Sequence, residues 1–270
     1  MPAASLIVST YNQPAWLEKA LWALEAQDFR DFEIIIADDG SGEATDRLIE
    51  RYRLASALHI RRVWHPDEGF RKTEILNRAI VAAGSDYLIF TDGDCLPRAD
   101  FITTHLALRR TGHFLSGGYY KLTRSVSHRI DREAVRNQAC FDPAWLRGQG
   151  QPRSVKDWKL TGNPAAAALL NRLTPTRPSW NGHNASAYRA DILAANGFDT
   201  RMKYGGEDRE FGERLVNAGL RPRQVRYSAI CLHLDHDRGY VTEEMIRAND
   251  AIRAATRREK SVRTPFGITG

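Results

Sequence analysis

The stretch Asp86-Tyr87-Leu88-Ile89-Phe90-Thr91-Asp92-Gly93-Asp94 decides the fold class of this chain of 270 residues. Residues 87–91 are apolar, aromatic or β-branched, which predicts a buried strand over residues 86–91. Asp92 and Asp94 follow at the carboxyl end, where open α/β sheets bind their ligands. Carboxylate oxygens suit Mg²⁺ or Mn²⁺, and such ions also hold substrate phosphates. The stretch therefore predicts a diphosphate held through a divalent cation at one edge of a sheet.

The N-terminal part of the chain alternates predicted strands with predicted helices. β-branched apolar runs predict strands at residues 4–10, 32–37 and 58–63. Apolar residues at helical spacing predict helices at residues 16–26, about 45–52 and 72–83. Strands that alternate with helices form a mostly parallel sheet with right-handed crossovers. The predicted fold class is therefore α/β, with a mixed, mostly parallel, Rossmann-like nucleotide-binding sheet.

The composition is that of an ordinary soluble globular protein, with 42% hydrophobic and 27% charged residues. No apolar run approaches the length of a membrane span, and residues 1–3 lead into a strand rather than a signal peptide. The three cysteines, Cys95, Cys140 and Cys231, are far apart and include no Cys-x-x-Cys pair. This pattern indicates a reducing compartment and argues against a disulfide framework or a structural zinc site. We therefore expect a cytoplasmic protein.

The net charge of +6 is concentrated near the C-terminus. Residues 247–263 hold six basic and two acidic side chains, a net of +4. These residues form either a solvated helix face or a docking surface for anionic lipid or a polyanionic partner, which would place the protein at the inner face of a membrane. Nucleic acid is not an expected partner, because the basic residues are not interleaved with aromatic ones and no reader motif occurs.

Polar residues follow three of the predicted strands. They are Thr10-Tyr11-Asn12, Asp38-Asp39-Gly40-Ser41 and Asp92-Gly93-Asp94. In a parallel sheet all three groups lie at the same edge, so they can face one ligand. The first group offers contacts to a nucleobase and a ribose, the second a carboxylate for a base N–H, and the third a metal and a ribose contact.

This order of motifs resembles family 2 glycosyltransferases of the GT-A fold, whose strands often end in Thr-Tyr-Asn, Asp-Asp-Gly-Ser and Asp-x-Asp. The resemblance implies that Asp38 or Asp39 contacts uracil, that Asp92 contacts the ribose or the metal, and that Asp94 binds the metal. The family also often carries a basic residue and an Asn in the helix before the Asp-x-Asp strand. The implied contacts to the donor nucleotide are Thr10, Tyr11, Asn12, Asp38, Asp39, Arg71, Lys72, Asn77, Asp92 and Gly93. Arg71 and Lys72 can equally form a solvated helix start.

A second motif, Tyr204-Gly205-Gly206-Glu207-Asp208-Arg209-Glu210, opens a predicted helix at residues 209–218. Paired glycines let the backbone approach a ligand, and the helix N-terminus favours ionised Glu207 and Asp208. An ionised carboxylate beside the sugar can deprotonate an acceptor hydroxyl, although both residues can instead simply cap the helix. The motif resembles Trp-Gly-Gly-Glu-Asp-x-Glu of β-1,4-galactosyltransferases and chondroitin polymerase domains. That resemblance implies Asp208 as general base, with Glu207 beside it, and a Tyr in place of the usual Trp.

Further segments match the same families. Residues 180–186 resemble their Gly-x-Asn-x-Ser element, and residues 197–199 match their Gly-Phe-Asp. The substrate-binding residues that the resemblance implies are Trp180, Asn184, Tyr204, Gly205 and Gly206. The implied ligands for Mn²⁺ or Mg²⁺ are Asp92, Asp94 and His233, with His236 in reserve.

The resemblance covers residues 4–112 and 180–236. We expect a nucleotide-binding half at residues 1–112, an acceptor-binding and catalytic half at 113–236 and, from its composition, a basic C-terminal helix or tail at 237–270. The expected reaction is metal-dependent, inverting transfer of a hexose of Gal, GalNAc or GlcA type from a UDP-sugar to a glycan hydroxyl. Family analogy places the acceptor in bacterial surface polysaccharide or lipopolysaccharide synthesis, free or lipid-linked.

Three alternatives stay open. A retaining GT-A glycosyltransferase would also use an Asp-x-Asp motif and a late His. A nucleotidyltransferase that makes sugar nucleotides should carry a Gly-rich basic loop after its first strand, and residues 11–14 are not such a loop. A non-catalytic nucleotide-sugar-binding module would not need both Asp94 and Asp208. Hydrolysis of a panel of UDP-sugars separates these classes.

Overall fold

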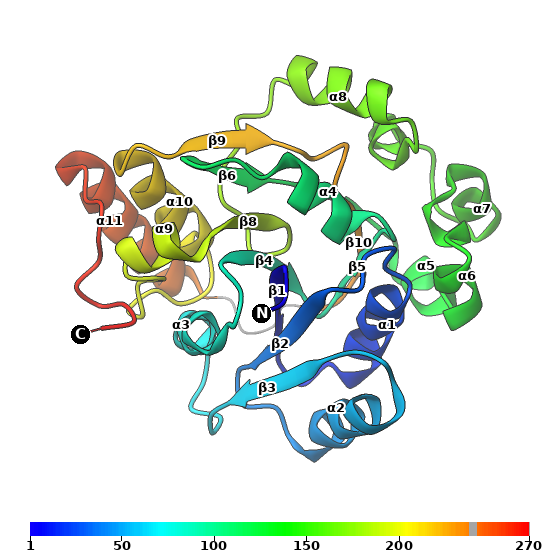
Figure 1. Cartoon of the computed structure of the whole chain (residues 1–270), viewed down its shortest axis with the longest axis horizontal. Coiled ribbons are helices and arrows are strands. Elements are labelled where there is room, and N and C mark those ends of the chain that lie inside the picture. The colour runs from blue at the N-terminus through cyan, green and yellow to red at the C-terminus, as the bar shows by residue number, and fades with distance from the viewer. Residues whose placement is uncertain (238–241, 270) are drawn as a thin grey trace.

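The computed structural model describes residues 1–237 and 242–269. Its centre is a seven-stranded sheet with the strand order β3-β2-β1-β4-β8-β6-β9 (Figure 1). The parallel N-terminal strands are β1 (Ala4–Thr10), β2 (Phe32–Asp38), β3 (Ile60–Trp64) and β4 (Tyr87–Asp92). The sheet continues with β8 (Ala185–Tyr188), which is antiparallel to β4 and to β6 (His113–Ser116), and ends with β9 (Arg221–Gln224), parallel to β6. The predicted α/β class with a mixed, mostly parallel sheet is confirmed.

A second sheet has three strands in the order β5-β10-β7. These strands are β5 (Cys95–Pro97), β10 (Ile230–His233) and β7 (Gly118–Lys121). β10 is antiparallel to β5, with His233 paired to Cys95, and parallel to β7. This pairing brings the late His233 next to the residue that follows Asp94.

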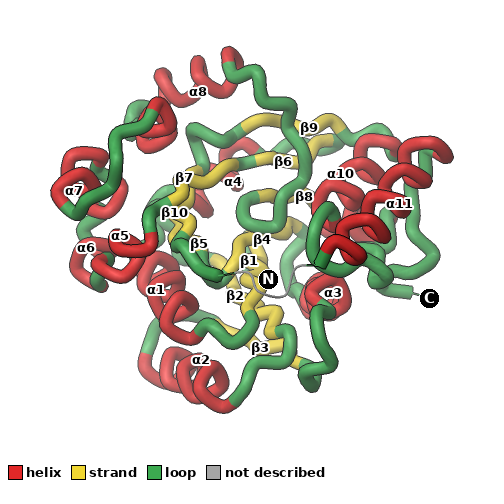
Figure 2. Tube along the Cα trace, turned by 180° about the vertical axis from the view of Figure 1, so that it is seen from behind, coloured by secondary structure: helices red, strands yellow, loops and turns green. Residues whose placement is uncertain are grey.

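The helices fall into three groups (Figures 1 and 2). One face of the large sheet packs against α1 (Pro14–Glu25), α2 (Glu43–Ala55) and α4 (Phe101–Leu108). The other face packs against α3 (Lys72–Ala82), α9 (Arg189–Ala194) and α10 (Glu207–Asn217), and α11 (Glu243–Glu259) lies on α10. The third group comprises α5 (Arg124–Arg129), α6 (Arg132–Arg136), η1 (Ala139–Phe141), α7 (Pro143–Gly148), η2 (Val155–Leu160) and α8 (Pro164–Leu173).

The apolar run of β1 explains why it sits in the middle of the sheet. Leu6 and Val8 pack into the core beneath α1 and α2 with Leu21, whereas Ile7 packs on the opposite face with Ile75 of α3. A strand of a parallel sheet is covered on both faces and therefore reads as a continuous hydrophobic run rather than an alternating one. The burial of β1 fixes its position between β2 and β4, and so places the polar residues that follow it at the carboxyl edge of the sheet.

The element boundaries differ from the predicted ones at a few places. α1 begins at Pro14 rather than Trp16, because proline is well suited to the first position of a helix. α10 begins at Glu207, which places that residue in the first turn as predicted. The sequence analysis missed β6 and β7, because each has only four residues and its pattern is too short to be distinguished from a loop.

Other features of the chain bear on the sequence predictions. No helix within the described ranges is long and apolar enough to cross a membrane. Cys95, Cys140 and Cys231 are buried free thiols, as expected without a disulfide framework. The large sheet crosses the predicted boundary at residue 112, since β6, β8 and β9 come after it in sequence and extend the same sheet.

A buried ion pair fastens α10 to its surroundings. Arg214 donates to Glu210 one turn earlier at 2.8 Å, and both side chains are almost fully buried. The same guanidinium donates to the backbone carbonyls of Ala195 and Gly197, and Thr256 of α11 donates to Glu210 at 2.8 Å. Burial removes the hydrogen bonds that Arg214 and Glu210 would form with water, and these protein partners replace them.

We predict that Arg214→Met lowers the free energy of unfolding by about 3–5 kcal/mol, because it leaves the Glu210 charge buried without its cation. Urea denaturation followed by circular dichroism measures the loss. The control is Arg47→Met, which removes an exposed ion pair with Glu43 and should cost about 1 kcal/mol or less. Equal losses in the two variants would show that the Arg214 pair does not fasten α10.

Candidate active site

The three predicted groups of polar residues lie side by side at one edge of the large sheet. β1 is hydrogen-bonded between β2 and β4, with Thr10 opposite Asp38 and Ser9 opposite Asp92. The turn after β4 is tied to β1, since the Gly93 N–H donates to the Ser9 carbonyl at 2.7 Å. The prediction that these strand ends share an edge is confirmed.

Asp38 and Asp39 have different surroundings. Asp38 is fully buried and accepts hydrogen bonds from Arg62 at 2.6 Å and from the Ser41 N–H at 2.8 Å. Its carboxylate holds the turn and β3 from inside, so of the two residues predicted to contact uracil, Asp38 or Asp39, the structure favours Asp39. Asp39 contacts His65 Nε2 at 2.7 Å and accepts from the Arg71 N–H at 3.1 Å. Burial raises the pKa of Asp39.

The loop after β1 lies beside the turn after β2. The Tyr11 side chain is exposed and donates to Asp67 at 2.8 Å. Asn12 has a positive φ of 46° and accepts from the Gly42 N–H at 2.9 Å, so it joins the two loops. Thr10 Oγ1 is buried and has no hydrogen-bond partner among the described residues. These positions leave Tyr11 and Asn12 at the solvent side of the edge, where a nucleoside can reach them.

Lys72 and Asp92 form the central ion pair of the site. Lys72, the first residue of α3, donates to Asp92 Oδ1 at 2.9 Å, and Ser9 Oγ donates to the same oxygen. Burial works against the Lys72 charge, but the carboxylates of Asp92, Asp208 and Glu207 outweigh it and raise the pKa of Lys72 well above its usual value. Burial likewise opposes the Asp92 charge, and Lys72 outweighs it, so the pKa of Asp92 falls. Both groups are therefore ionised at neutral pH.

The other two residues predicted in this helix do not reach the pair. Arg71 forms ion pairs with Glu68 and with Glu74, the latter at 2.6 Å, on the outer side of α3. Asn77 is buried, accepts from the Phe198 N–H at 2.7 Å and donates to the Phe198 carbonyl at 2.8 Å. The donor contact predicted for Asn77 is wrong, because its amide is used to join α3 to the turn before α10.

Asp94 and two histidines form a cluster that can hold a metal. His236 Nε2 lies 2.7 Å and His233 Nε2 lies 3.6 Å from Asp94 Oδ2. Ligand atoms of Asp94, Cys95 and His233 all lie within 4.8 Å of one another. Burial raises the pKa of the Cys95 thiol well above its usual value, so it stays protonated. The usable donors are therefore a carboxylate and imidazoles, a set that suits Mn²⁺ and leaves positions open for phosphate oxygens.

The glycine pair shapes the loop before α10. Gly205 and Gly206 have φ values of 101° and 95°, which side-chain-bearing residues rarely adopt. A Cβ at Gly205 would lie 2.3 Å from Ile246 and one at Gly206 would lie 3.0 Å from Arg253, both on α11. The glycines therefore let α11 approach the loop, and the predicted approach of the pair to a substrate stays a prediction. Tyr204 is half-buried, and its ring packs edge-on against Phe70 at 6.0 Å.

Glu207 and Asp208 sit in the first turn of α10, as the sequence predicts. Glu207 accepts from the Gly205 N–H and Asp208 Oδ2 accepts from the Gly182 N–H, each at 2.8 Å. Asp208 Oδ1 is buried and has no hydrogen-bond partner among the described residues. Burial and the neighbouring Asp208 raise the pKa of Glu207 to about 7, and burial raises the pKa of Asp208. A carboxylate with one free oxygen and a raised pKa is suited to accept a proton.

Trp180 and Asn184 are not ligand contacts, contrary to prediction. Trp180 is fully buried, with its ring 4.8 Å from that of Phe211 and 5.2 Å from that of Phe90. Asn184 is also fully buried and donates to the carbonyls of Gly118 and Ala229 at 2.8 Å each. Both side chains support the loop whose Gly182 N–H contacts Asp208, so they act from behind the site.

The sequence analysis missed Asn249 of α11. Its amide nitrogen donates to the carbonyls of Lys203, Tyr204 and Gly205 at 2.8–3.1 Å, and its oxygen accepts from the Lys203 N–H at 3.2 Å. The side chain is almost fully buried. The helical spacing of Ile246, Asn249, Arg253 and Thr256 is a signal that could have found it, since all four face the loop or α10.

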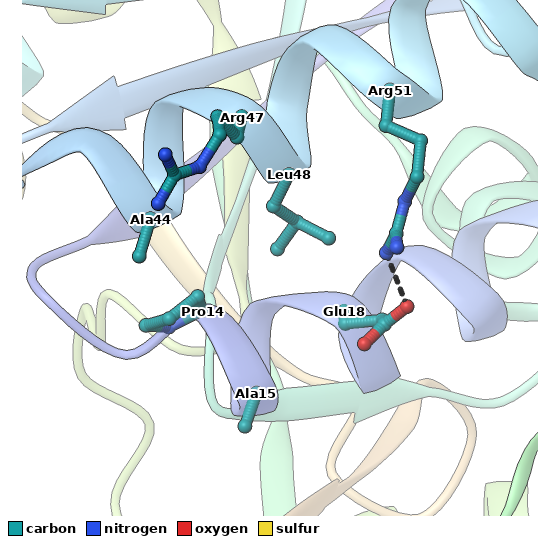
Figure 3. A pocket seen from close by; sticks show the side chains of 7 residues that line it. All are labelled: Pro14, Ala15, Glu18, Ala44, Arg47, Leu48 and Arg51. Carbon is teal, nitrogen blue, oxygen red and sulfur yellow. Dashed lines mark hydrogen bonds and ion pairs between the residues drawn. The ribbon is translucent and has the colours of Figure 1, made fainter.

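A surface groove between α1 and α2 lies outside this cluster (Figure 3). Its walls carry two arginines, each paired with a glutamate: Arg51 with Glu18, and Arg47 with Glu43. None of the residues that line the groove belongs to the groups described above. The groove therefore adds no residue to the candidate site.

Comparison with known proteins finds glycosyltransferase and polysaccharide-synthase relatives of this chain. Validoxylamine A glucosyltransferase of Streptomyces hygroscopicus subsp. jinggangensis (strain 5008) is 27% identical over 254 residues, covering 88% of this chain and 57% of the relative. Chondroitin synthase of Escherichia coli is 25% identical over 230 residues, covering 82% of this chain and 33% of the relative. The chain thus spans about half the length of the first of these relatives and a third of the second.

Two solved structures share the fold. TarS of S. aureus in complex with UDP-GlcNAc has a TM-score of 0.64 and 16% identity, covering 95% of this chain and 69% of that one. The mannosyltransferase PcManGT from Pyrobaculum calidifontis in complex with GDP-Man and Mn²⁺ has a TM-score of 0.59 and 20% identity, and the match covers 88% of this chain and 59% of that one. The profile of the family Glycosyl transferase family 2 matches residues 5–172. This match covers more than half of the sequence, so the chain belongs to glycosyl transferase family 2 and has the GT-A fold.

Proposed function

We propose that this protein is a metal-dependent, inverting glycosyltransferase that moves a hexose from a UDP-sugar to a hydroxyl of a glycan acceptor. The observation that carries the proposal is the position of Asp208. Its free buried oxygen lies close enough to the Lys72–Asp92 pair for the charges to act on one another. A proton acceptor thus stands beside the edge at which the donor diphosphate would bind.

The donor nucleotide is assigned to the loops after β1 and β2. Tyr11 and Asn12 face solvent there, and Asp39 lies behind them with Thr10. A UDP donor is supported by the relatedness of the chain to TarS, whose structure contains UDP-GlcNAc. Lys72 donates to Asp92 at the edge where the diphosphate would bind. Its ammonium group has three N–H donors, so it could keep one on Asp92 and direct another to a phosphate oxygen.

Asp94 and His233, with Asp92 nearby and His236 in reserve, are the residues that would hold Mn²⁺ or Mg²⁺. The arrangement fits such an ion, because a carboxylate and imidazoles converge and burial keeps the neighbouring Cys95 thiol protonated. A bound divalent cation offsets the charge that develops on the leaving diphosphate. The mannosyltransferase of the same fold, solved with GDP-Man and Mn²⁺, supports this assignment.

Asp208 is the proposed general base. The Gly182 N–H holds Oδ2, so the other oxygen stays directed to a partner that the described residues do not supply. This oxygen would take the proton from the acceptor hydroxyl while that hydroxyl attacks the anomeric carbon from the face opposite the diphosphate. Glu207 shares the site and is proposed to hold a hydroxyl of the acceptor or donor sugar.

The finer assignments stay proposals. They are a Gal, GalNAc or GlcA type of sugar, an acceptor in surface polysaccharide or lipopolysaccharide synthesis, a cytoplasmic location, and the division at residues 112 and 236. Association with a membrane through the basic tail is not retained. Four of its six basic residues have acidic partners within the chain, including Arg253 and Arg257 on Glu213.

α11 is proposed to position the base. Asn249 holds three successive carbonyls of the loop that leads into Glu207 and Asp208, while Ile246 and Arg253 pack on its glycines. A loop with two left-handed glycines has many accessible conformations, and these hydrogen bonds select one of them. Asn249 itself does not touch the reacting groups.

The first test of this function is a panel of UDP-sugars assayed for hydrolysis and transfer with and without Mn²⁺. We expect one donor to be turned over only with the cation, and Asp94→Ala to abolish cation-dependent UDP binding measured by calorimetry. The matched control is Asp100→Ala, which removes a carboxylate paired with Arg98. If neither a chelator nor Asp94→Ala changes the affinity for UDP, Asp94 does not hold a metal that UDP binding requires.

The second test is the pH dependence of turnover. Asp208 must be ionised to accept a proton and its pKa is raised, so kcat should rise with pH as Asp208 ionises; the adjacent Glu207, with a pKa of about 7, is coupled to that acid limb. Glu207→Gln removes one of two adjacent negative charges, so Asp208 ionises more easily and the acid limb moves to lower pH. Asp208→Asn should lower kcat roughly 10²–10⁴-fold with UDP affinity nearly unchanged. Near-normal transfer by Asp208→Asn would remove it from the mechanism.

The third test separates positioning from chemistry. Asn249→Ala should lower kcat by about tenfold or more while the KM for the donor stays near its normal value, because Asn249 holds the loop at residues 203–205 and not the loops after β1 and β2 that are assigned to the nucleotide. The acid limb should remain, since Asp208 is still present. A melting curve of the Asn249→Ala variant confirms that the assay temperature lies below its melting temperature. An unchanged kcat in the folded variant would show that the loop keeps its conformation without Asn249.

A further inference from the structure

Residues 152–177 form a surface, called here the 152–177 surface, whose large apolar side chains point into solvent. The exposed fractions are 88% for Val155, 66% for Trp158, 55% for Leu169 and 69% for Leu173. α8 buries only Ala167, so this helix turns most of its apolar side chains outward. Monomeric proteins rarely gather exposed apolar side chains in this way unless the surface binds something.

The same surface is basic. Residues 152–177 contain five basic side chains and one acidic one, a net of +4. Asp157, the acidic one, accepts from Tyr120 at 2.8 Å and pairs with Arg147. Within the described ranges, no ion pair is formed by Arg153, Lys156, Lys159, Arg172 or Arg177. The 152–177 surface therefore carries five basic side chains that no acidic side chain of the described residues pairs with.

The surface is mounted firmly on the fold. Arg98 donates to the carbonyls of Thr161 and Ser228 at 3.0 and 2.9 Å, and Asn171 of α8 donates to Ser228 Oγ at 2.8 Å. The Tyr227 N–H donates back to Asn171 at 3.0 Å. One loop thus holds both the end of η2 and α8. Both views place α8 at the rim of the molecule, on the side away from α11 (Figures 1 and 2).

The surface also lies one layer from the candidate metal residues. η2 packs on β7, where Lys159 donates to the Tyr119 carbonyl at 2.8 Å. The Tyr119 ring lies 5.1 Å from that of His233 and 4.7 Å from that of His183. Anything that binds Val155 or Trp158 is therefore held next to the edge at which the sugar would be transferred.

We propose that the 152–177 surface docks the protein onto an anionic phospholipid bilayer. Trp158 and the leucines of α8 would enter the interface, and the basic side chains would meet the lipid phosphates. A second copy of this chain fits less well, since it would bring the same positive charge to the contact. The reason for docking, access to a lipid-linked acceptor, rests on the proposed function; the binding itself does not.

The experiment is sedimentation of the full chain with vesicles of equimolar phosphatidylcholine and phosphatidylglycerol, and with vesicles of phosphatidylcholine alone. We expect binding to the anionic vesicles only, weakened by salt. Trp158→Ser with Leu173→Ser, and separately Lys156→Glu with Arg172→Glu, should each lower the partition coefficient about tenfold or more. The matched controls are Leu54→Ser with Val81→Ser, exposed apolar residues of α2 and α3, and Arg258→Glu with Lys260→Glu on the tail. These should bind as the wild type does.

Several results would overturn the proposal. The first is wild-type protein that does not bind anionic vesicles at low salt. The second is an equal loss of vesicle binding in the surface and control variants. The third is a wild-type dimer in mass photometry that is a monomer in the surface variants. Transfer to a soluble acceptor, measured on the same samples, should be spared by the surface variants. Vesicle binding without any transferase activity would remove the proposed function and leave the docking surface, whereas transfer without vesicle binding would do the reverse.

Discussion

The ion pair between Lys72 and Asp92 is the interaction on which the site depends. It joins the start of α3 to the end of β4, and its cation also acts on Glu207 and Asp208 at the start of α10. Without Lys72, three carboxylates from two elements would face one another in a partly buried space, where their repulsion is poorly screened. The pair therefore allows Asp92, proposed to act on the donor, and Glu207 and Asp208, proposed to act on the acceptor, to lie close together although they come from a strand and a helix. It also explains why Asp92 is ionised at neutral pH, whereas burial and Asp208 raise the pKa of Glu207 against the effect of Lys72.

The second constraint comes from the far end of the chain. The loop that carries the proposed base has two glycines in left-handed conformations, and α11 fixes it through Asn249 and through the close packing of Ile246. The segment after α11 returns to the same region, where Thr264 donates to Asp199 at 2.7 Å. The C-terminal residues thus pack against α10 and the loop before it, and four of their basic side chains pair with acids of α10 and α11. This arrangement gives the tail a structural reason for its charge.

Much of the fold and the core of the site could be predicted from the sequence, because strand ends and helix starts have strong local patterns. Asp94, His233 and Asp208 lie where the sequence placed them. Trp180, Asn184 and Asn77 belong to the same motifs but support the site from the core, and Asp38 holds its own turn. A motif does not distinguish a residue that touches the ligand from one that holds the loop, because that depends on which way the side chain faces in the packed molecule. The helical spacing around Asn249 marks a buried face but not what that face contacts, because its partners are backbone carbonyls more than forty residues earlier.

The central claim is that Asp208 directs an acceptor hydroxyl to the face of the sugar opposite the diphosphate. The most direct test is the configuration of the new glycosidic bond, measured from the anomeric proton coupling in the NMR spectrum of the product made from whichever UDP-sugar the enzyme accepts. We expect the configuration opposite to that of the donor, a β-linkage from an α-linked UDP-hexose. A product that keeps the donor's configuration would contradict it, because a single proton-accepting carboxylate on the acceptor side does not produce retention.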